Sequence, residues 1–511
     1  MKKILGIELG STRIKAVMVD ESGAVIAQGS HDWENKLENG LWTYSLDDVW
    51  AGVQASYKAL CQNYGKAITT LDAIGISAMM HGYLAFDKND NLLVPFRTWR
   101  NTNTAQSALE LSSALDFNMP QRWSASHFYQ AVLNGEEHVK NVTFLTTLAG
   151  YVHWKLTGER VLGIGDASGM FPVLDGEYDS ARLEKYNALL KAHGCECDLG
   201  ALLPKILVAG QDAGHLTKAG ALLLDPTGTL ESGALLCPPE GDAGTGMTAT
   251  NAVRMRTGNV SAGTSAFAMV VLEKPLSRVN EMIDVVATPS GAPVAMVHAN
   301  NFTCEINSWT NVFVDFLELI GVDMPKGKVF DLLYEVSAKS DFDLGGLVGY
   351  NFISGEPIVG LESGVPLIAR MPSGKLTLAN LMQLQLYSAL GAMSIGMEFL
   401  AEENVKIDAI CGHGGFFKTP FIGANAMSCA LGAPITVMKN AGEGGAWGVA
   451  LLALYATQSG VSLEDFLDTL FASAQKETTV ASESDKAKFA SFMKTYKTGL
   501  ALERRATEIF N

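Results

Sequence analysis

The chain has 511 residues, which is too many for one hydrophobic core, so we expect at least two domains. Its 48% hydrophobic and 18% charged residues are ordinary for a globular protein and exclude a long disordered chain. The net charge of −16 argues against nucleic acid or an anionic membrane as a partner, because both are bound by clustered Lys and Arg. No apolar run reaches the roughly 18 residues of a membrane span. Scattered cysteines make no disulfide framework in a chain of this length, so we expect a cytoplasmic protein with reduced thiols.

The amino-terminal part of the chain alternates predicted strands and helices. Two strands are predicted within Leu5–Val19, on either side of a Gly10-Ser11-Thr12 turn. A helix is predicted over Ser45–Tyr64, with Ser45 as its N-cap, and Ala73–Met80 follows as a buried strand. Strands followed by helices indicate an α/β domain in which helices cover a largely parallel sheet.

The second half of the chain begins like the first. The segment Gly258–Glu273 is again a strand, a turn of one glycine and two hydroxyl residues, and a strand, so Gly263-Thr264-Ser265 aligns with Gly10-Ser11-Thr12. This weak internal repeat predicts two related domains that face each other, over residues 1–252 and 253–511, each with its own hairpin turn.

Both turns have the composition of a phosphate-binding loop. Glycine lets the backbone approach closely and leaves amide groups free to converge on an anion, and the hydroxyls add donors. Taken alone, each turn is equally compatible with a simple hairpin. The sequence contains neither a Walker A motif nor G-x-G-x-x-G, so a nucleotide site here is of another type.

Asp242 is a candidate for proton transfer. It lies in the Gly-rich segment Pro239–Ala252, among small residues that leave room beside its carboxylate. Such a carboxylate either shapes a turn or serves as a general base for a substrate hydroxyl. Read alone, the segment favours the turn.

Glycines also gather late in the chain. A predicted strand within Ile410–Phe421 ends at Gly414-Gly415, and Ala441–Tyr455 places glycines inside a predicted helix. Because a helical glycine costs about 1 kcal/mol relative to alanine, either a flat ligand approaches closely or the helix packs tightly on a sheet. Both interpretations stay open.

Two polar loops are candidates for one binding cleft. His81 follows the predicted strand Ala73–Met80, and a polar loop around Trp99 follows soon after. Proteins of the α/β class place ligand contacts after strand ends. A lone histidine there is nevertheless more often structural.

Taken together and in this order, these segments resemble the FGGY family of carbohydrate kinases, from Gly6 to about Tyr455. The resemblance implies two actin-like, ribonuclease-H-like ATPase domains around a central cleft. It also implies ATP-dependent phosphorylation of a sugar hydroxyl with Mg²⁺, so the partners are a sugar and ATP. A homodimer is considered as the assembly, although no residue pattern points to one.

The resemblance assigns the nucleotide to both turns and to two late segments. Glu8 stands where the family usually has the Asp of its phosphate and magnesium hairpin, and Phe416 replaces a third Gly of the adenosine segment. The segment from Ala441 matches the late helix of the family's nucleotide domain. The residues implied in ATP binding are Gly10, Ser11, Thr12, Gly263, Thr264, Ser265, Gly414, Gly415, Phe416 and Lys418, with Glu8 at the metal.

The resemblance also assigns the sugar. Met80-His81-Gly82 is similar to the sugar-binding segment of xylulokinases, and Trp99–Thr104 resembles their Trp-Asn-Asp-x-x-Thr segment. Both segments favour a ketopentose such as xylulose. The residues implied in sugar binding are Met80, His81, Trp99, Asn101 and Asp242, and Asp242 is also the implied catalytic base.

Other substrates and other classes of protein stay open. L-ribulose, a ketohexose, glycerol, gluconate or another polyol fits the same family, because Asn101 replaces an acid. A sugar-independent actin-like ATPase or chaperone shares the fold, and Glu8 and Phe416 leave room for a catalytically dead sensor. Gly165–Met170 resembles a family segment beside the active site, and residues 457–511 are expected to be mostly helical.

Overall fold

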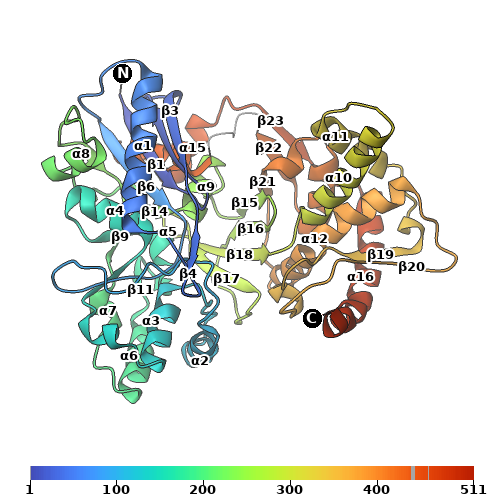
Figure 1. Cartoon of the computed structure of the whole chain (residues 1–511), viewed down its shortest axis with the longest axis horizontal. Helices are drawn as coiled ribbons and strands as arrows, with labels where there is room; N and C mark the ends of the chain where they lie inside the picture. Colours follow the sequence, from blue (N-terminus) through green and yellow to red (C-terminus); the bar gives the residue numbers. More distant parts are fainter. Residues whose placement is uncertain (1, 420, 439–443, 459, 511) are drawn as a thin grey trace. The chain divides into compact units, whose positions relative to one another are not determined.

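The computed structural model describes residues 2–419, 421–438, 444–458 and 460–510, which fall into two compact units (Figure 1). Unit 1 comprises Met1–Arg254, Arg278–Val294 and Ala441–Ser473. Unit 2 comprises Met255–Ser277, Ala295–Asn440 and Ala474–Asn511. The units therefore differ from the predicted division into 1–252 and 253–511, because two later segments are grouped with the first unit.

The main sheet of unit 1 has the strand order β13-β6-β1-β2-β3, with β14 also paired to β6. The pairs β1–β6 and β6–β14 are parallel, whereas β1–β2 and β2–β3 are antiparallel. The predicted hairpin around residues 10–12 and the predicted buried strand after it are confirmed. The strands are β1 (Ile4–Leu9), β2 (Arg13–Val19), β3 (Val25–Asp32), β6 (Ala73–Ala78), β13 (Leu235–Leu236) and β14 (Glu240–Gly241).

Helices cover both faces of this sheet. A Cβ on Gly29 of β3 would lie 2.3 Å from the backbone of α1 (Leu46–Tyr64), and a Cβ on Gly6 of β1 would lie 2.1 Å from a carbonyl of α14 (Gly444–Ala456). The register aligns Gly29 with Ile7, the neighbour of Gly6, so these two contacts lie on opposite faces. Helix α1 begins at Ser45, whose side chain accepts from the Asp48 amide, and ends at Gly65 with φ of 72°, as predicted.

The glycines of α14 serve tight packing on unit 1. A Cβ on Gly448 would lie 2.0 Å from the Thr245 carbonyl, and one on Gly75 of β6 would lie 2.5 Å from the Val449 carbonyl. Of the two interpretations of these helical glycines, close packing is the one the structure shows. By contacts α14 is grouped with unit 1, although the sequence assigned this segment to the nucleotide domain; residues 441–443 lie outside the described residues.

The remaining elements of unit 1 surround the main sheet. Short paired strands are β4 (Lys36–Glu38), β5 (Leu41–Thr43), β7 (Leu84–Phe86), β8 (Phe144–Thr146), β9 (Val161–Gly163), β10 (Val173–Leu174), β11 (Glu177–Tyr178) and β12 (Lys205–Leu207), and β17 (Ile283–Ala287) also belongs to this unit. The helices are α2 (Ala105–Leu115), α3 (Ser124–Leu133), α4 (Leu148–Thr157), α5 (Ile164–Ala167), α6 (Ser180–Ala192), α7 (Leu199–Leu202), α8 (Lys218–Leu224), α9 (Asp242–Ala249) and α15 (Leu463–Leu470).

Unit 2 repeats the arrangement of hairpin and parallel strand. Its sheet contains the order β18-β16-β15-β21-β22-β23, in which β15–β16 is an antiparallel hairpin and β21 runs parallel to β15. The internal repeat predicted at residues 10 and 263 is therefore present in the fold. The strands are β15 (Thr257–Ala262), β16 (Ala266–Val271), β18 (Pro293–Ala299), β19 (Leu347–Tyr350), β20 (Leu367–Arg370), β21 (Ala409–His413), β22 (Ile435–Met438) and β23 (Lys476–Thr479).

Five long helices complete unit 2: α10 (Cys304–Leu319), α11 (Lys326–Ser337), α12 (Leu378–Glu402), α13 (Ile422–Leu431) and α16 (Glu483–Phe510). The expectation of a mostly helical carboxyl-terminal stretch is confirmed, although β23 adds a strand there by pairing with β22. In the described part of the chain no helix is long and apolar enough to cross a membrane, and the seven cysteines form no disulfide.

Candidate active site

The predicted site residues of unit 1 come together because three strands end at one edge of the sheet. β1, β6 and β14 run parallel, with Glu8 beside Ser77 and Ser77 beside Glu240 in register. The segments that leave these strands are Gly10–Thr12, Met79–His81 and Asp242 onward. The carboxyl edge of a parallel sheet is the usual place for ligand contacts in α/β proteins.

Asp242 is the first residue of α9, at the amino end of that helix. Its Oδ1 accepts a hydrogen bond from the Met80 amide at 3.2 Å, which ties it to the segment predicted to bind the sugar. The residue stays open to solvent on one side. Loss of hydration around the carboxylate raises its pKa, and the bond from Met80 opposes that shift. A solvent-open carboxylate with a raised pKa is suited to accept a proton.

Glu8 lies one strand away, on the face covered by α14. Its Oε2 accepts from the Ala446 amide at 3.1 Å, in the first turn of that helix. A Cβ on Gly445 would lie 2.3 Å from Oε1, so the carboxylate packs directly on the helix end. Burial, followed by repulsion from Asp242, raises the pKa of Glu8 to about 7. Glu8 and Asp242 therefore lie close enough to repel each other when both are charged.

Two buried carboxyls lie close to Asp242: Glu240, which the sequence analysis did not name, and Asp166, which belongs to the Gly165–Met170 segment that resembles a family segment beside the active site. Glu240 accepts from the amides of Gly165 and Asp166, at 3.2 and 2.9 Å. Asp166 accepts from the Thr147 hydroxyl at 2.6 Å, while its Oδ1 is buried without a partner in the described structure. Burial raises the pKa of Asp166 to about 7, and burial with repulsion from Asp166 raises that of Glu240 to about 8. In the sequence, the only sign of these two carboxyls is that each is an acidic residue within a stretch of small residues, Gly163–Gly169 for Asp166 and Pro239–Gly244 for Glu240.

His81 is held tightly at the end of β6. Its φ is 68°, a left-handed backbone that costs free energy for a non-glycine residue. Its Nδ1 lies 3.0 Å from the Gly169 carbonyl, and its ring stacks on Trp123 with centroids 6.1 Å apart. A carbonyl can only accept, so this contact places a proton on Nδ1. A Cβ on Gly169 would come within 2.7 Å of Nδ1, which explains the glycine.

The second predicted sugar loop shows two different environments. Trp99 is 36% exposed, so part of this large residue is open to solvent. Asn101 is buried and committed to the backbone: its Oδ1 accepts from the Trp42 amide, and its Nδ2 donates to the carbonyls of Trp42 and Thr98. Asn101 therefore holds the loop in place through these hydrogen bonds. This structural role was not predicted from the sequence.

The turn at residues 10–12 is anchored through its carbonyls. Gly10 O accepts from the Trp33 indole, Ser11 O from the Tyr44 hydroxyl and Thr12 O from the Trp33 amide, at 2.7, 2.6 and 3.1 Å. The amides of Ser11 and Thr12 have no hydrogen-bond partner within the described residues. An anchored turn with unused amides is a suitable anion-binding geometry.

The turn at residues 263–265 of unit 2 is anchored in the same way. Gly263 O accepts from the Thr303 hydroxyl at 2.7 Å and Thr264 O from the Phe302 amide at 2.9 Å. In the described structure the Thr264 and Ser265 amides likewise have no partner. The two turns therefore share a backbone arrangement as well as a sequence pattern.

The adenosine segment of unit 2 is only partly open. Gly414 has φ of 109°, and a Cβ there would lie 2.4 Å from the Ala262 carbonyl, so only glycine fits. Gly415 and Lys418 are exposed. Phe416 is buried, with its ring 4.9 Å from Phe302. The Phe416 ring thus belongs to the interior of unit 2.

Comparison with known proteins decides the family. Residues 3–227 match the N-terminal domain of the FGGY family of carbohydrate kinases, and residues 258–457 match its C-terminal domain. The chain belongs to the FGGY family of carbohydrate kinases. It is therefore an enzyme, a sugar kinase that uses ATP, and the fold of two actin-like, ribonuclease-H-like domains is confirmed.

Several relatives share most of the length. A xylulose kinase of Haemophilus influenzae is 22% identical over 475 residues, covering 89% of this chain and 91% of that protein. Among solved structures, a xylulose kinase and a gluconate kinase from Lactobacillus acidophilus each give a TM-score of 0.79, at 17% and 18% identity, over 98% of both chains. At identities below 20%, these two structures support the fold of this chain and not its substrate.

Proposed function

We propose that this kinase transfers the γ-phosphoryl group of ATP to a hydroxyl of a ketopentose such as xylulose, with Asp242 as the catalytic base. The observation that carries the proposal is the position of Asp242. It lies at the carboxyl edge of the sheet, bound to the Met80 amide, directly beside the segment that resembles a sugar-binding segment.

Asp242 would take the proton of the attacking hydroxyl. The sugar oxygen then forms a bond to the γ-phosphorus while the bond between that phosphorus and the β–γ bridging oxygen breaks, and ADP leaves with the electron pair. Asp242 holds the proton until solvent removes it. Such transfers depend on positioning and charge neutralisation more than on covalent work by the protein.

The sugar would be held by the two loops of unit 1. His81 is fixed by the Gly169 carbonyl and the Trp123 ring, so it offers a rigid polar contact. Trp99 is partly open to solvent and offers a ring on which the carbon face of a sugar can pack. Met80 acts through its amide, which orients Asp242, and Asn101 acts through the backbone of its loop.

The nucleotide would be held by both turns and by the segment after β21. The amides and hydroxyls of Ser11, Thr12, Thr264 and Ser265 would donate to phosphate oxygens, with Gly10 and Gly263 allowing close approach. Gly414 and Gly415 would face the nucleoside through their backbone and Lys418 would supply a positive charge, whereas buried Phe416 would shape the pocket from inside.

The carboxylates of unit 1 fit Mg²⁺ as an ion that arrives with ATP. Mg²⁺ prefers oxygen ligands and often uses one or two carboxylates together with substrate phosphates. Asp242 is open to solvent, and its repulsion with Glu8 would be relieved by a cation. Glu8, which accepts from Ala446 through Oε2, would contribute its charge and its other oxygen to the ion, and Asp242 would stay available to accept the proton. The ion would neutralise phosphate charge.

The choice of sugar rests on the relatives and on one sequence segment. Proteins named xylulose kinase from Staphylococcus xylosus and Bacillus subtilis match parts of the chain at 23% and 24% identity. Met80-His81-Gly82 is the segment in this chain that resembles xylulokinases. The gluconate kinase with the same fold makes gluconate the first competing substrate to test.

A coupled assay for ADP across a panel of substrates tests the proposal. Xylulose, L-ribulose, ketohexoses, glycerol and gluconate are compared at equal concentrations, with ATP alone as the control. We expect xylulose to give the highest kcat/KM and ATP alone to give negligible turnover. Turnover independent of any sugar would indicate an ATPase and reject the proposal, and a preference for gluconate would reject the ketopentose.

A further inference from the structure

Unit 2 contains a buried carboxyl that the proposed chemistry does not use. Glu356 lies in the loop that follows β19, and its side chain is fully buried. Its Oε2 accepts from the backbone amide of Asn301 at 3.1 Å and from the side-chain amide of Asn301 at 3.2 Å. Its Oε1 is buried without a hydrogen-bond partner in the part of the chain that is described. A buried carboxyl with one oxygen unpaired lowers stability, which makes Glu356 a candidate for a functional role.

Asn301 joins the loop of Glu356 to the segment between β18 and α10. Asn301 is buried, and its Oδ1 accepts from the amides of Ile353 and Ser354 at 3.0 and 3.1 Å. Its Nδ2 donates to the Gly355 carbonyl as well as to Glu356. Both polar atoms of the Asn301 side chain are therefore used to bind one loop, which fixes the position of this residue.

Asn351 holds the same segment through its carbonyls. This residue directly follows β19 and is buried. Its Nδ2 donates to the carbonyls of Asn301 and Phe302 at 2.9 and 3.2 Å. Hydrogen bonds from two sites in the loop therefore hold the backbone at residues 301 and 302. We call Glu356, Asn301 and Asn351 the unit 2 network.

The segment that the unit 2 network holds is the one that anchors the turn at residues 263–265. The Phe302 amide donates to the Thr264 carbonyl at 2.9 Å, and the Thr303 hydroxyl donates to the Gly263 carbonyl at 2.7 Å. The amides of Thr264 and Ser265 have no partner among the described residues. The direction of these amides therefore depends on where residues 302 and 303 are placed.

The same segment also supports the part of unit 2 implied in adenosine binding. The Phe302 ring lies 4.9 Å from the Phe416 ring, measured between centroids. Two parts of the proposed nucleotide site thus contact residues 302 and 303. A small displacement of these residues would weaken the bonds from the turn to a phosphate, because hydrogen bonds depend steeply on distance and angle.

We propose that Glu356 is a positioning residue for the nucleotide. Through Asn301 it holds residues 302 and 303, and these in turn fix the amides of the turn at 263–265 for a phosphate group. This role rests on the proposed function in one respect, namely that the turn binds ATP. Glu356 itself does not touch the nucleotide, since its side chain is fully buried. A turn that is already ordered binds more tightly, because less conformational freedom is lost on binding.

Removal of the Glu356 carboxyl should weaken ATP binding. In Glu356→Ala the two donors of Asn301 lose their acceptor, so we expect the Kd for ATP, measured by calorimetry, to rise at least about tenfold. The KM for the sugar should stay within about twofold of wild type, because the sugar loops lie in unit 1. Glu356→Gln keeps an acceptor oxygen on a side chain of the same length and should recover most of the lost affinity. A merely structural role would not separate ATP from sugar in this way.

A double-mutant cycle tests whether Glu356 acts through the turn. Thr264→Val removes a hydroxyl of this turn, and Thr12→Val removes one from the turn of unit 1. Glu356→Ala combined with Thr264→Val should weaken ATP binding little more than either change alone, whereas the effects of Glu356→Ala and Thr12→Val should multiply to about a hundredfold. If Glu356→Ala does not fold, Thr303→Val tests the same link, because it removes only the hydroxyl that holds the Gly263 carbonyl. Its effect should likewise not multiply with that of Thr264→Val.

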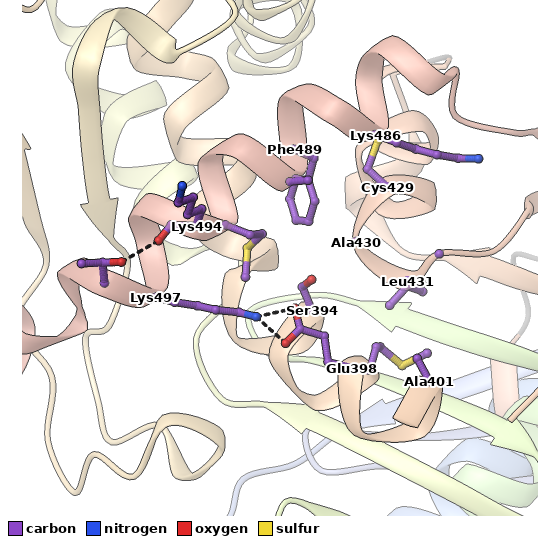
Figure 2. A pocket seen from close by; sticks show the side chains of 15 residues that line it. Ser394, Glu398, Ala401, Cys429, Ala430, Leu431, Lys486, Phe489, Lys494 and Lys497 are labelled. Carbon is purple, nitrogen blue, oxygen red and sulfur yellow. Dashed lines mark hydrogen bonds and ion pairs between the residues drawn. The ribbon is translucent and has the colours of Figure 1, made fainter. Parts of the chain in front are cut away.

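The matched control lies in another part of unit 2. Glu398 is exposed, and it lines a groove of about 630 Å³ formed by α12, the end of α13 and α16 (Figure 2). It pairs there with Lys497, and the groove includes no residue of the unit 2 network. Glu398→Ala makes the same change of side chain and charge as Glu356→Ala. Because an exposed ion pair contributes little to stability, we expect this variant to bind ATP as the wild type does.

Two results would overturn the positioning role. They are a folded Glu356→Ala variant with the ATP affinity of the wild type, and an effect of Glu356→Ala or Thr303→Val that multiplies with that of Thr264→Val. If Thr264→Val weakens ATP binding and either result is found, the positioning role fails while the proposed binding role of the turn stands. If Thr264→Val leaves ATP binding unchanged, the binding role of the turn fails, and the positioning role of Glu356 fails with it.

Discussion

The two hairpins share a backbone arrangement but differ in electric charge. In each, the turn carbonyls are anchored by residues further along the chain and two amides have no partner among the described residues. The β1–β2 hairpin has Glu8 before its turn, with Asp242 close enough to raise the pKa of Glu8. At the aligned position, the β15–β16 hairpin has Ser261.

This difference in charge between the two hairpins bears on which unit supplies the catalytic base. A turn that only donates hydrogen bonds can bind a phosphate in either unit. Proton transfer needs a carboxylate whose hydration and neighbours are controlled, and the carboxyls with raised pKa values around Asp242 all lie in unit 1. On the proposed function, both hairpins would bind the nucleotide and unit 1 would supply the catalytic base.

Removing the base should have the largest effect. Asp242→Asn keeps the shape of the side chain but cannot accept the proton, so kcat should fall by roughly 10²–10⁴. ATP affinity, measured by calorimetry, should change little. The matched control is Asp47→Asn, an exposed acid of the first turn of α1. Activity within a factor of a few of wild type would remove Asp242 from the role of base.

Substitutions in the two turns should weaken nucleotide binding to similar extents. Thr12→Val and Thr264→Val each remove one exposed hydroxyl and keep the volume, and a hydrogen bond to a charged phosphate contributes about 1.5–3 kcal/mol. We expect the Kd for ATP to rise at least about tenfold in each variant, with the Kd for the sugar unchanged. A larger effect on sugar than on ATP would contradict the shared binding role.

The packing of α14 on Glu8 is tested by one glycine. A Cβ on Gly445 would lie 2.3 Å from Glu8 Oε1 and 2.9 Å from Thr245 Oγ1, so Gly445→Ala should force the Glu8 carboxylate to move and destabilise unit 1 by about 1 kcal/mol. The control is Gly327→Ala in α11, where a Cβ would have no neighbour within 4 Å. Urea unfolding should show a lower midpoint for the first variant only. Equal urea midpoints for Gly445→Ala and wild type would mean that α14 is not tightly packed against Glu8.

The buried carboxyl of Asp166 should make the stability of the protein depend on pH. The pKa of Asp166 is about 7 in the folded protein, above its ordinary value near 4, so the folded protein keeps a proton that the unfolded chain releases in that window. The contribution of this carboxyl therefore makes the free energy of unfolding fall as pH rises from about 4 to 7 and stay level above.

Asp166→Asn removes that contribution. The stability of the variant relative to wild type should then increase between pH 5 and pH 8, as measured by urea unfolding at each pH. The exposed variant Asp47→Asn serves as the control and should follow the wild type. Parallel curves for Asp166→Asn and wild type would show that Asp166 is not a protonated buried acid.

The parts that the sequence predicted are those with local signals. The β1–β2 hairpin, the cap at Ser45 and the repeated turn at Gly263 depend on residues close together in the chain, and all three appear in the structure. Family resemblance added Asp242, whose Gly-rich segment alone favoured a turn.

The parts that the sequence did not predict depend on distant contacts. The grouping of α14 with unit 1 follows from Gly6 and Gly75, which are far from that helix in sequence. Phe416 became an interior residue because Phe302 and Tyr334 surround it. The pairing of Glu240 with the amides at Asp166 likewise joins two segments that no local pattern connects.

A crystal structure with the sugar and a non-hydrolysable ATP analogue tests the central claim most directly. The account predicts a sugar hydroxyl within hydrogen-bond distance of the Asp242 carboxylate, on the side away from the Met80 amide. A bound sugar with no hydroxyl near Asp242, or one placed beside a different carboxylate, would contradict it.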